Sequence, residues 1–240
     1  MAALTNKIAV VTGASSGIGR AIALQLAAEG AILCLVGRNL EALTETKAIA
    51  LQTAPKVTTY CANLTNDDDL SQLQEDIQRL GQVDVLVHSA GVFKMGKLEN
   101  SAIADFDLQY QINVRAPYLL TQALLPMLLT SQGQIVFVNS SAGLNARANV
   151  GQYAASKFAL KAIADSLREE VNAQGVRVLS IYPGRTASPM QAAIYQMEGR
   201  TYQSENLLQP EDVATTVVNT LSLPRTAEIT DLHIRPCKKT

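Results

Sequence analysis

The sequence predicts an α/β fold in which a parallel, doubly wound sheet of about seven strands carries helices on both faces. Short β-branched runs alternate along the chain with longer segments of helical spacing. The strand-like runs are almost continuously apolar, which is typical of parallel strands buried on both faces. A glycine-rich turn directly follows the first run, as in the Rossmann-type architecture. Because no linker or internal repeat divides the 240 residues, we expect a single domain over residues 1–240.

The hydrophobic periodicity places the elements in chain order. Strands are predicted at Lys7–Thr12, Ile32–Val36, Lys56–Tyr60, Val83–Val87, Gln134–Asn139, Val176–Tyr182 and Ile229–Ile234. Helices are predicted at Ile18–Glu29, Leu40–Gln52, Asp68–Leu80, Phe106–Leu129, Tyr153–Ala173 and Asp212–Leu221. Pro117 fits a first turn only if a helix begins near Arg115, so we expect a kink or a break in Phe106–Leu129. The segment Pro183–Pro210 is too long for an ordinary connection and is expected to cover a substrate, with a mobile surface helix as the alternative.

The composition excludes several classes of protein. Charged residues make up 17% of the chain and the net charge is −1, which argues against a disordered protein and against a basic surface for nucleic acid or membrane. Cys34, Cys61 and Cys237 have neither disulfide-like nor zinc-like spacing, and we expect no metal site. Cys34 and Cys61 lie in apolar runs and are predicted to be buried. Without a membrane span or the pattern of a secretory signal, we expect a cytoplasmic protein.

The turn after the first strand, TGASSGIG at residues 12–19, has the chemistry of a dinucleotide site. Gly13 would allow a tight turn, Gly17 would let the backbone approach a pyrophosphate, and Gly19 would let the helix pack closely on the strand. The helix that follows would present free N–H groups to the phosphates. We therefore predict that a dinucleotide contacts Gly13, Ser15, Ser16, Gly17, Ile18 and Gly19.

The end of the second strand bears on the choice of cofactor. An NAD site usually has Asp or Glu there to bind the ribose 2′-hydroxyl, whereas this chain has Gly37 followed by Arg38. A guanidinium can pair with a 2′-phosphate, which a carboxylate would repel. The sequence therefore favours NADP(H) over NAD(H), with a solvated Arg38 beside the next helix as the alternative.

Tyr153 and Lys157 lie four residues apart at the start of a predicted helix and therefore share one face. An ammonium close to a phenol favours the phenolate and lowers its pKa from about 10. Tyr153 is thus a candidate general acid for carbonyl reduction, or base for alcohol oxidation. An inert surface pair is the alternative interpretation of this spacing taken alone.

The glycine turn, Tyr153, Lys157 and their order resemble the short-chain dehydrogenase/reductase family, in its short single-domain branch. The resemblance covers roughly residues 7–236 and extends to further positions of the family pattern. These are Ser140 at the end of the fifth strand, Asn113 in the preceding helix, the pair Pro183-Gly184 after the sixth strand, and the nearby hydroxyls of Thr186 and Ser188.

The resemblance implies hydride transfer between C4 of a nicotinamide and a carbonyl carbon. Tyr153 would exchange a proton with the substrate oxygen, and Ser140 would hold that oxygen. Lys157 would bind the nicotinamide ribose and lower the pKa of Tyr153. Asn113 would anchor a water that links Lys157 to solvent.

Three departures from the family pattern concern the cofactor wall and the C-terminus. The family's Asn-Asn-Ala-Gly is His88-Ser89-Ala90-Gly91 here. We expect His88 to be a packed structural residue, while Ser89, Ala90 and Gly91 line the cofactor site. The usual Asp beside the adenine is replaced by Asn63, which precedes Leu64 and whose amide can still accept a hydrogen bond. The last strand lacks the Gly-Gly of many relatives, so the usual tetramer contacts are not implied by the resemblance, whereas the chemistry is unaffected.

These observations favour an NADP(H)-dependent carbonyl reductase or alcohol dehydrogenase with a small-molecule substrate. A cofactor-binding sensor or scaffold with little catalysis, and an NADP-assisted epimerase or dehydratase, are the alternatives.

Arg147 and Arg185 are expected to be exposed, with recognition of an anionic group as the alternative. Asp67–Asp69 are expected to complement a helix dipole. Because Phe106–Leu129 and Tyr153–Ala173 have more than one apolar stripe, we expect a homodimer or homotetramer.

Overall fold

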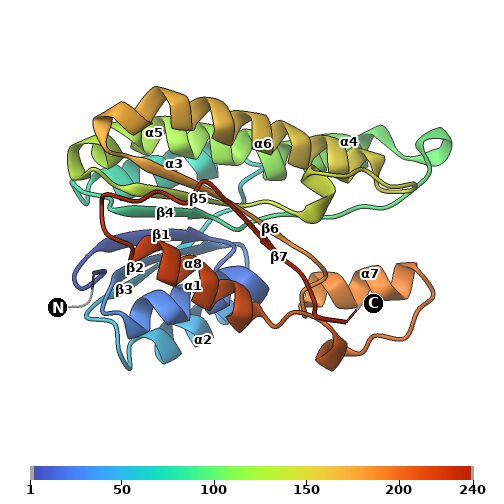
Figure 1. Cartoon of the computed structure of the whole chain (residues 1–240), viewed down its shortest axis with the longest axis horizontal. Helices are drawn as coiled ribbons and strands as arrows, with labels where there is room; N and C mark the ends of the chain where they lie inside the picture. The colour runs from blue at the N-terminus through green and yellow to red at the C-terminus, as the bar shows by residue number, and fades with distance from the viewer. Residues whose placement is uncertain (1–2, 239–240) are drawn as a thin grey trace.

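The computed structural model describes residues 3–238 and contains the predicted seven-stranded parallel sheet. Its order is β3-β2-β1-β4-β5-β6-β7, so the winding direction reverses between β1 and β4 (Figure 1). A ligand-binding crevice is expected at such a reversal, outside the carboxyl ends of the strands. The strands are β1 (Ile8–Thr12), β2 (Ile32–Gly37), β3 (Val57–Cys61), β4 (Val85–His88), β5 (Gln134–Val138), β6 (Arg177–Pro183) and β7 (Asp231–Ile234).

Helices cover both faces of the sheet (Figure 1). Successive strand side chains point to opposite faces, so Val11 lies in one apolar core and Val10 in the other, which explains the continuous apolar runs. One face packs against α1 (Gly17–Ala28), α2 (Leu40–Ala50) and α8 (Pro210–Leu221). The other face packs against α3 (Asp67–Gln78), α5 (Ala116–Ser131) and α6 (Gly151–Val171), with α4 (Ile103–Tyr110) preceding α5.

The helix predicted over Phe106–Leu129 is interrupted, as expected from Pro117. A π-helical turn over Gln111–Arg115 separates α4 from α5, and Pro117 lies in the first turn of α5. Proline has no N–H to donate to the carbonyl four residues earlier, which here belongs to Asn113. The altered hydrogen-bond ladder therefore falls on the very turn that carries Asn113, and such turns are frequent at functional sites.

The segment Pro183–Pro210 is more regular than its sequence suggested. It contains α7 (Pro189–Met197), beyond the carboxyl ends of the strands (Figure 1), and a short 3-10 turn at Ser204–Asn206. Ser188 caps α7 by accepting a hydrogen bond of 3.1 Å from the Gln191 N–H, and a proline opens the helix. This Ser-Pro pair is a helix-start signal, and it could have predicted α7.

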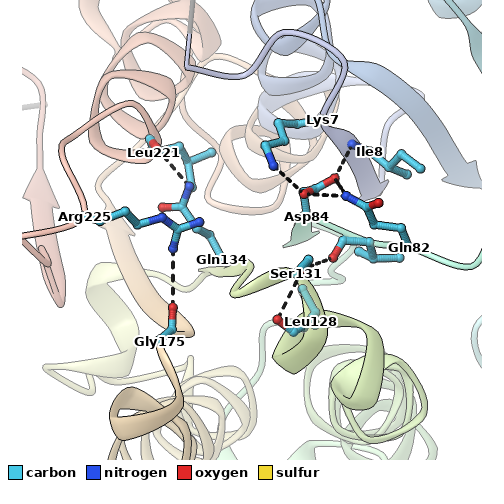
Figure 2. A network of polar contacts seen from close by, with 11 residues as sticks. Lys7, Ile8, Gln82, Asp84, Leu128, Ser131, Gln134, Gly175, Leu221 and Arg225 are labelled. Carbon is cyan, nitrogen blue, oxygen red and sulfur yellow. Dashed lines mark hydrogen bonds and ion pairs between the residues drawn. The ribbon is translucent and has the colours of Figure 1, made fainter.

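The amino ends of the strands are joined by polar contacts distant from the carboxyl ends. Asp84 accepts hydrogen bonds of 2.9 Å from Lys7 Nζ and from the Ile8 N–H (Figure 2). In the same region, Gln134 Nε2 donates to the carbonyl oxygen of Leu221 at 2.9 Å.

Two further expectations can be compared with the described residues. Cys34 is buried as predicted. The prediction for Cys61 is wrong, because Cys61 is exposed at the last position of β3, which is an edge strand of the sheet. Among residues 3–238, no helix is long and apolar enough to span a membrane.

Candidate functional site

A cavity of about 390 Å³ opens at the carboxyl ends of the strands, where the sheet order reverses. Its wall is built from the glycine turn, the ends of β2, β4, β5 and β6, the start of α6, and α7. Almost all of the residues predicted from the sequence line it. They are Gly13, Ser15, Ser16, Gly17, Ile18, Gly19, Arg38, Leu64, Ser89, Ala90, Gly91, Ser140, Tyr153, Lys157, Pro183, Gly184, Thr186 and Ser188.

The glycine turn has the backbone that the dinucleotide interpretation requires. Gly13 adopts φ +69°, and a Cβ there would lie 2.7 Å from the Ala90 nitrogen. A Cβ on Gly19 would clash with the carbonyl oxygen of Gly13, so the helix can approach the strand only because this residue is glycine. No side chain caps the first turn of α1, so its N–H groups are left to a ligand in the cavity.

Thr12 joins the two strands that flank the crevice, although the sequence reasoning gave it no role. Its hydroxyl donates to the carbonyl oxygen of Val87 at 3.3 Å and accepts from the N–H groups of Ser89 and Ala90 at 3.1 and 3.2 Å. These bonds set the position of the cavity wall after β4 relative to the glycine turn.

The cavity wall near the ends of β2 and β3 differs in part from expectation. Arg38 is exposed and lines the cavity at the end of β2. Asn63 does not line it, because its side-chain oxygen accepts from the N–H and the hydroxyl of Thr65 at 3.2 and 3.0 Å in a local turn. Its neighbours Ala62 and Leu64 form the wall instead, so the prediction that Asn63 faces the cofactor is corrected.

Tyr153 and Ser140 come together from different elements. Tyr153 lies in the first turn of α6, and Ser140 lies two residues beyond the end of β5. Burial raises the pKa of Tyr153, while a hydrogen bond with Ser140 works in the opposite direction. Phe93 contacts the Tyr153 ring edge-on, with the centroids 4.9 Å apart. The Tyr153 ring therefore has an aromatic neighbour in Phe93 and a hydroxyl neighbour in Ser140.

Lys157 is buried beside Tyr153. Its ammonium donates to the carbonyl oxygen of Val138 at 3.0 Å and lies 5.9 Å from the centroid of the Tyr153 ring. Burial lowers the pKa of Lys157 to about 8. Burial is the largest cause of the pKa shift of both Tyr153 and Lys157.

Asn113 supports the site from behind the cavity wall. It is fully buried, and its Oδ1 accepts from the Val92 N–H at 2.9 Å. Its Nδ2 donates to the carbonyl of Val92 and to the hydroxyl of Ser156, both at 3.0 Å. The Asn113 side chain thus joins the segment after β4 to α6.

His88 is a packed structural residue, as expected. Its ring is buried, stacks on Phe137 at 5.0 Å between centroids, and places Nε2 2.8 Å from the Thr121 hydroxyl. Burial lowers the pKa of His88 to about 3, so the ring is neutral at physiological pH.

An ion pair between Arg185 and Glu198 joins the two segments that flank α7, and both residues line the cavity. Arg185 donates to both carboxylate oxygens of Glu198 at 2.9 and 2.7 Å, and its guanidinium lies 4.9 Å from the Tyr195 ring centroid. The expectation of an exposed Arg185 is therefore wrong, because Glu198 at the end of α7 reaches back to it. Arg147 is exposed as expected, but it also lines the cavity.

The three acidic residues of α3 have the structural role predicted for them. They occupy its first turn, where Asp69 accepts from the Asn63 N–H at 2.8 Å and Asp67 pairs with Arg115. That ion pair lowers the pKa of Asp67. They lie outside the cavity wall.

Together, the fold and the cavity define a protein built to bind a dinucleotide at the reversal point of a Rossmann-type sheet. Residues 7–199 match the family model for short chain dehydrogenases, and the chain belongs to that family. An uncharacterized oxidoreductase of Staphylococcus epidermidis is 36% identical over 238 residues, which cover 98% of this chain and 100% of the relative.

Solved structures show the same likeness. An alcohol dehydrogenase from the archaeon Thermococcus sibiricus, complexed with 5-hydroxy-NADP, superposes with a TM-score of 0.88 at 25% identity, over 98% of each chain. A metagenomic short-chain oxidoreductase in complex with NADP gives a TM-score of 0.84 at 30% identity, over 99% of this chain and 100% of that one. The chain is therefore an oxidoreductase of the short-chain dehydrogenase family.

Proposed function

We propose that the protein is an NADP(H)-dependent carbonyl reductase or alcohol dehydrogenase in which Tyr153 is the general acid or base. The observation that carries the proposal is the meeting of Tyr153, Ser140 and Lys157 in one wall of a cavity whose opposite end is the glycine turn. A sensor or scaffold would need only the glycine turn, so the presence of the whole set favours an enzyme.

The cavity fits a dinucleotide, because side chains at Gly13 and Gly19 would fill the place where backbone approaches backbone. The glycine turn would hold the pyrophosphate, and residues 89–91 and Leu64 would form the wall on the adenosine side. Pro183, Gly184, Thr186 and Ser188 would hold the nicotinamide end. The exposed Arg38 supports NADP(H) over NAD(H), and the two similar solved structures contain NADP or its 5-hydroxy derivative.

The bound nicotinamide would supply or accept the hydride, and the chain's own residues would manage the proton. The Ser140 hydroxyl would donate to the substrate oxygen while Tyr153 transfers its proton there. Because burial raises the pKa of Tyr153, the phenol keeps its proton at neutral pH, as a proton donor for carbonyl reduction requires. Lys157, with a pKa of about 8, is mostly charged at pH 7 and would bind the ribose.

The decisive test compares wild type with Tyr153→Phe on a panel of carbonyl compounds, followed by the loss of NADPH absorbance. We expect the wild type to consume NADPH in step with product, and the variant to lose turnover while its NADPH affinity stays within about twofold. Turnover by Tyr153→Phe would contradict the assignment. Product formed without net NADPH consumption would indicate the epimerase or dehydratase instead.

We further infer that the chain acts as a single domain in a cytoplasmic homodimer or homotetramer. Tyr118 on α5 and Phe158 on α6 support the assembly, because these aromatic side chains are 49% and 43% exposed. The segment Pro183–Pro210 would cover the substrate through α7, whose Ile194 and Gln191 line the cavity.

A further inference from the structure

Three consecutive residues at the end of β5 contact the functional residues of α6. The carbonyl oxygen of Val138 accepts from Lys157 Nζ at 3.0 Å. The Asn139 side chain donates from Nδ2 to the main-chain carbonyl of Lys157 at 3.1 Å, and its Oδ1 accepts from the Ser140 N–H at 2.8 Å. Ser140 and Tyr153 both line the cavity, and the Ser140 hydroxyl acts against the rise in the pKa of Tyr153. Asn139 therefore joins the strand end that carries Ser140 to the helix that carries Tyr153 and Lys157.

The Asn139 amide is held in a single place. The residue is 4% exposed, and its own N–H donates to the carbonyl oxygen of Ile181 in β6 at 2.8 Å. Both ends of the amide have partners, so a rotation would leave buried polar groups unpaired. Gly143 makes the room, because a Cβ there would clash with Asn139 Oδ1 and lie 3.0 Å from the Lys157 carbonyl.

We propose that Asn139 is a positioning residue, which sets the place of Ser140 relative to Tyr153 and Lys157. The proposal rests on the proposed function, because it concerns the same reaction. Donors that converge on a developing charge must be in place before the reaction begins. A displacement of about 1 Å can cost roughly a hundredfold in rate. Asn139 acts through these neighbours, since its amide bonds only to main-chain groups.

The test uses two substitutions of Asn139. Asn139→Ala removes both side-chain hydrogen bonds. Asn139→Asp has nearly the same shape and keeps the acceptor for the Ser140 N–H, but it sets a carboxylate oxygen against the Lys157 carbonyl. We expect kcat to fall roughly ten- to a hundredfold in Asn139→Ala, and we expect a fall in Asn139→Asp as well. The Kd for NADPH should change much less than kcat.

Gln134→Ala is a matched control at the opposite end of the same strand. Gln134 is 7% exposed, and its amide donates to the Leu221 carbonyl at 2.9 Å (Figure 2). Each alanine variant therefore loses a buried hydrogen bond from a side-chain amide to a main-chain carbonyl. We expect comparable shifts of the urea-unfolding midpoint, at one protein concentration, but a kcat within about twofold of wild type for Gln134→Ala only.

Gly143→Ala and the titration of Tyr153 supply two further readouts. Gly143→Ala displaces the Asn139 amide without removing a hydrogen-bonding group, so kcat should again fall. The absorbance of the Tyr153 phenolate, taken against Tyr153→Phe with NADP⁺ present, follows that residue without turnover. Its midpoint should rise in Asn139→Ala, because the hydrogen bond from Ser140 that favours the phenolate is no longer aligned.

The outcomes separate this proposal from the proposed function. A kcat of Asn139→Ala within twofold of wild type would overturn the positioning role, as would equal losses of kcat in Asn139→Ala and Gln134→Ala. If the wild type oxidises NADPH with none of the carbonyl compounds, the proposed function fails. The midpoint of the Tyr153 phenolate titration is then the deciding measurement, and an unchanged midpoint in Asn139→Ala would overturn the positioning role of Asn139.

Discussion

Acid should destabilise this protein more strongly than a variant in which His88 is replaced by asparagine. His88 ends β4, directly before the residues that wall the cavity. Burial lowers its pKa from 6.5 to about 3 in the folded protein, whereas the unfolded chain titrates near the ordinary value. Between these two values the unfolded state binds the additional proton, so the contribution to stability is complete above about pH 6.5 and is lost as the pH falls toward 3.

The size of the effect follows from the two pKa values. Each pH unit in this window removes about 1.4 kcal/mol from the free energy of unfolding, so the loss from this residue is about 2 kcal/mol at pH 5. The carboxylates also lose stabilising contacts in acid, but they are the same in both proteins. The difference between wild type and His88→Asn therefore isolates the histidine.

Urea unfolding of both proteins, at several pH values between about 8 and 4.5 and at one protein concentration, measures this difference. The wild-type free energy of unfolding should fall faster than that of His88→Asn, and the two curves should diverge below about pH 6.5. Curves that stay parallel through this range would refute a buried, neutral His88. The replacement also loses the contact with Thr121 at pH 8, but that offset does not depend on pH.

Three further predictions concern the cofactor, the segment that contains α7, and the assembly. Arg38→Asp should weaken NADPH binding by roughly ten- to a hundredfold while NADH binding improves, as fluorescence titration would show; unchanged relative affinities would contradict the role of Arg38. Glu198→Ala should raise the KM for the carbonyl substrate about fivefold, at an unchanged NADPH Kd, because it removes the ion pair with Arg185 that holds the end of α7 in place. Phe158→Glu on the exposed face of α6 should shift the molar mass by light scattering toward the monomer, and an unaltered mass would argue against pairing through that face.

The sheet could be predicted from the sequence because its signal is local. Strands buried on both faces need continuous apolar runs, and the seven predicted runs all correspond to strands of the parallel sheet. The interruption near Pro117 was equally local, since a missing N–H acts within one turn. The bounds of α7 were not predicted, because Gln191, Ile194, Tyr195 and Glu198 have the spacing of an inner face but are too mixed in polarity to stand out.

The site was predictable only where a motif fixes the backbone. The glycine turn, Tyr153 and Lys157 lie in the cavity wall as expected. Asn139 precedes Ser140 in the sequence, but the Lys157 carbonyl that it contacts on α6 lies 18 residues away. No spacing rule predicts a hydrogen bond between a strand end and a helix carbonyl. The pair of Arg185 and Glu198 was missed for the same reason, and Asn63 was misplaced because a local turn to Thr65 competes for its side chain.

The pKa values of the site bear on the direction of the proposed reaction. Burial raises the pKa of Tyr153 and lowers that of Lys157 to about 8, so both shifts favour the neutral form of each group. A neutral phenol is ready to give a proton, which is the need of carbonyl reduction, whereas alcohol oxidation needs the phenolate. Oxidation should therefore gain rate as the pH rises through the Tyr153 pKa, while reduction should hold its rate at neutral pH and decline above that pKa. Profiles of kcat in the two directions would show this opposition, and the same pH dependence in both would exclude Tyr153 as the group that exchanges the proton.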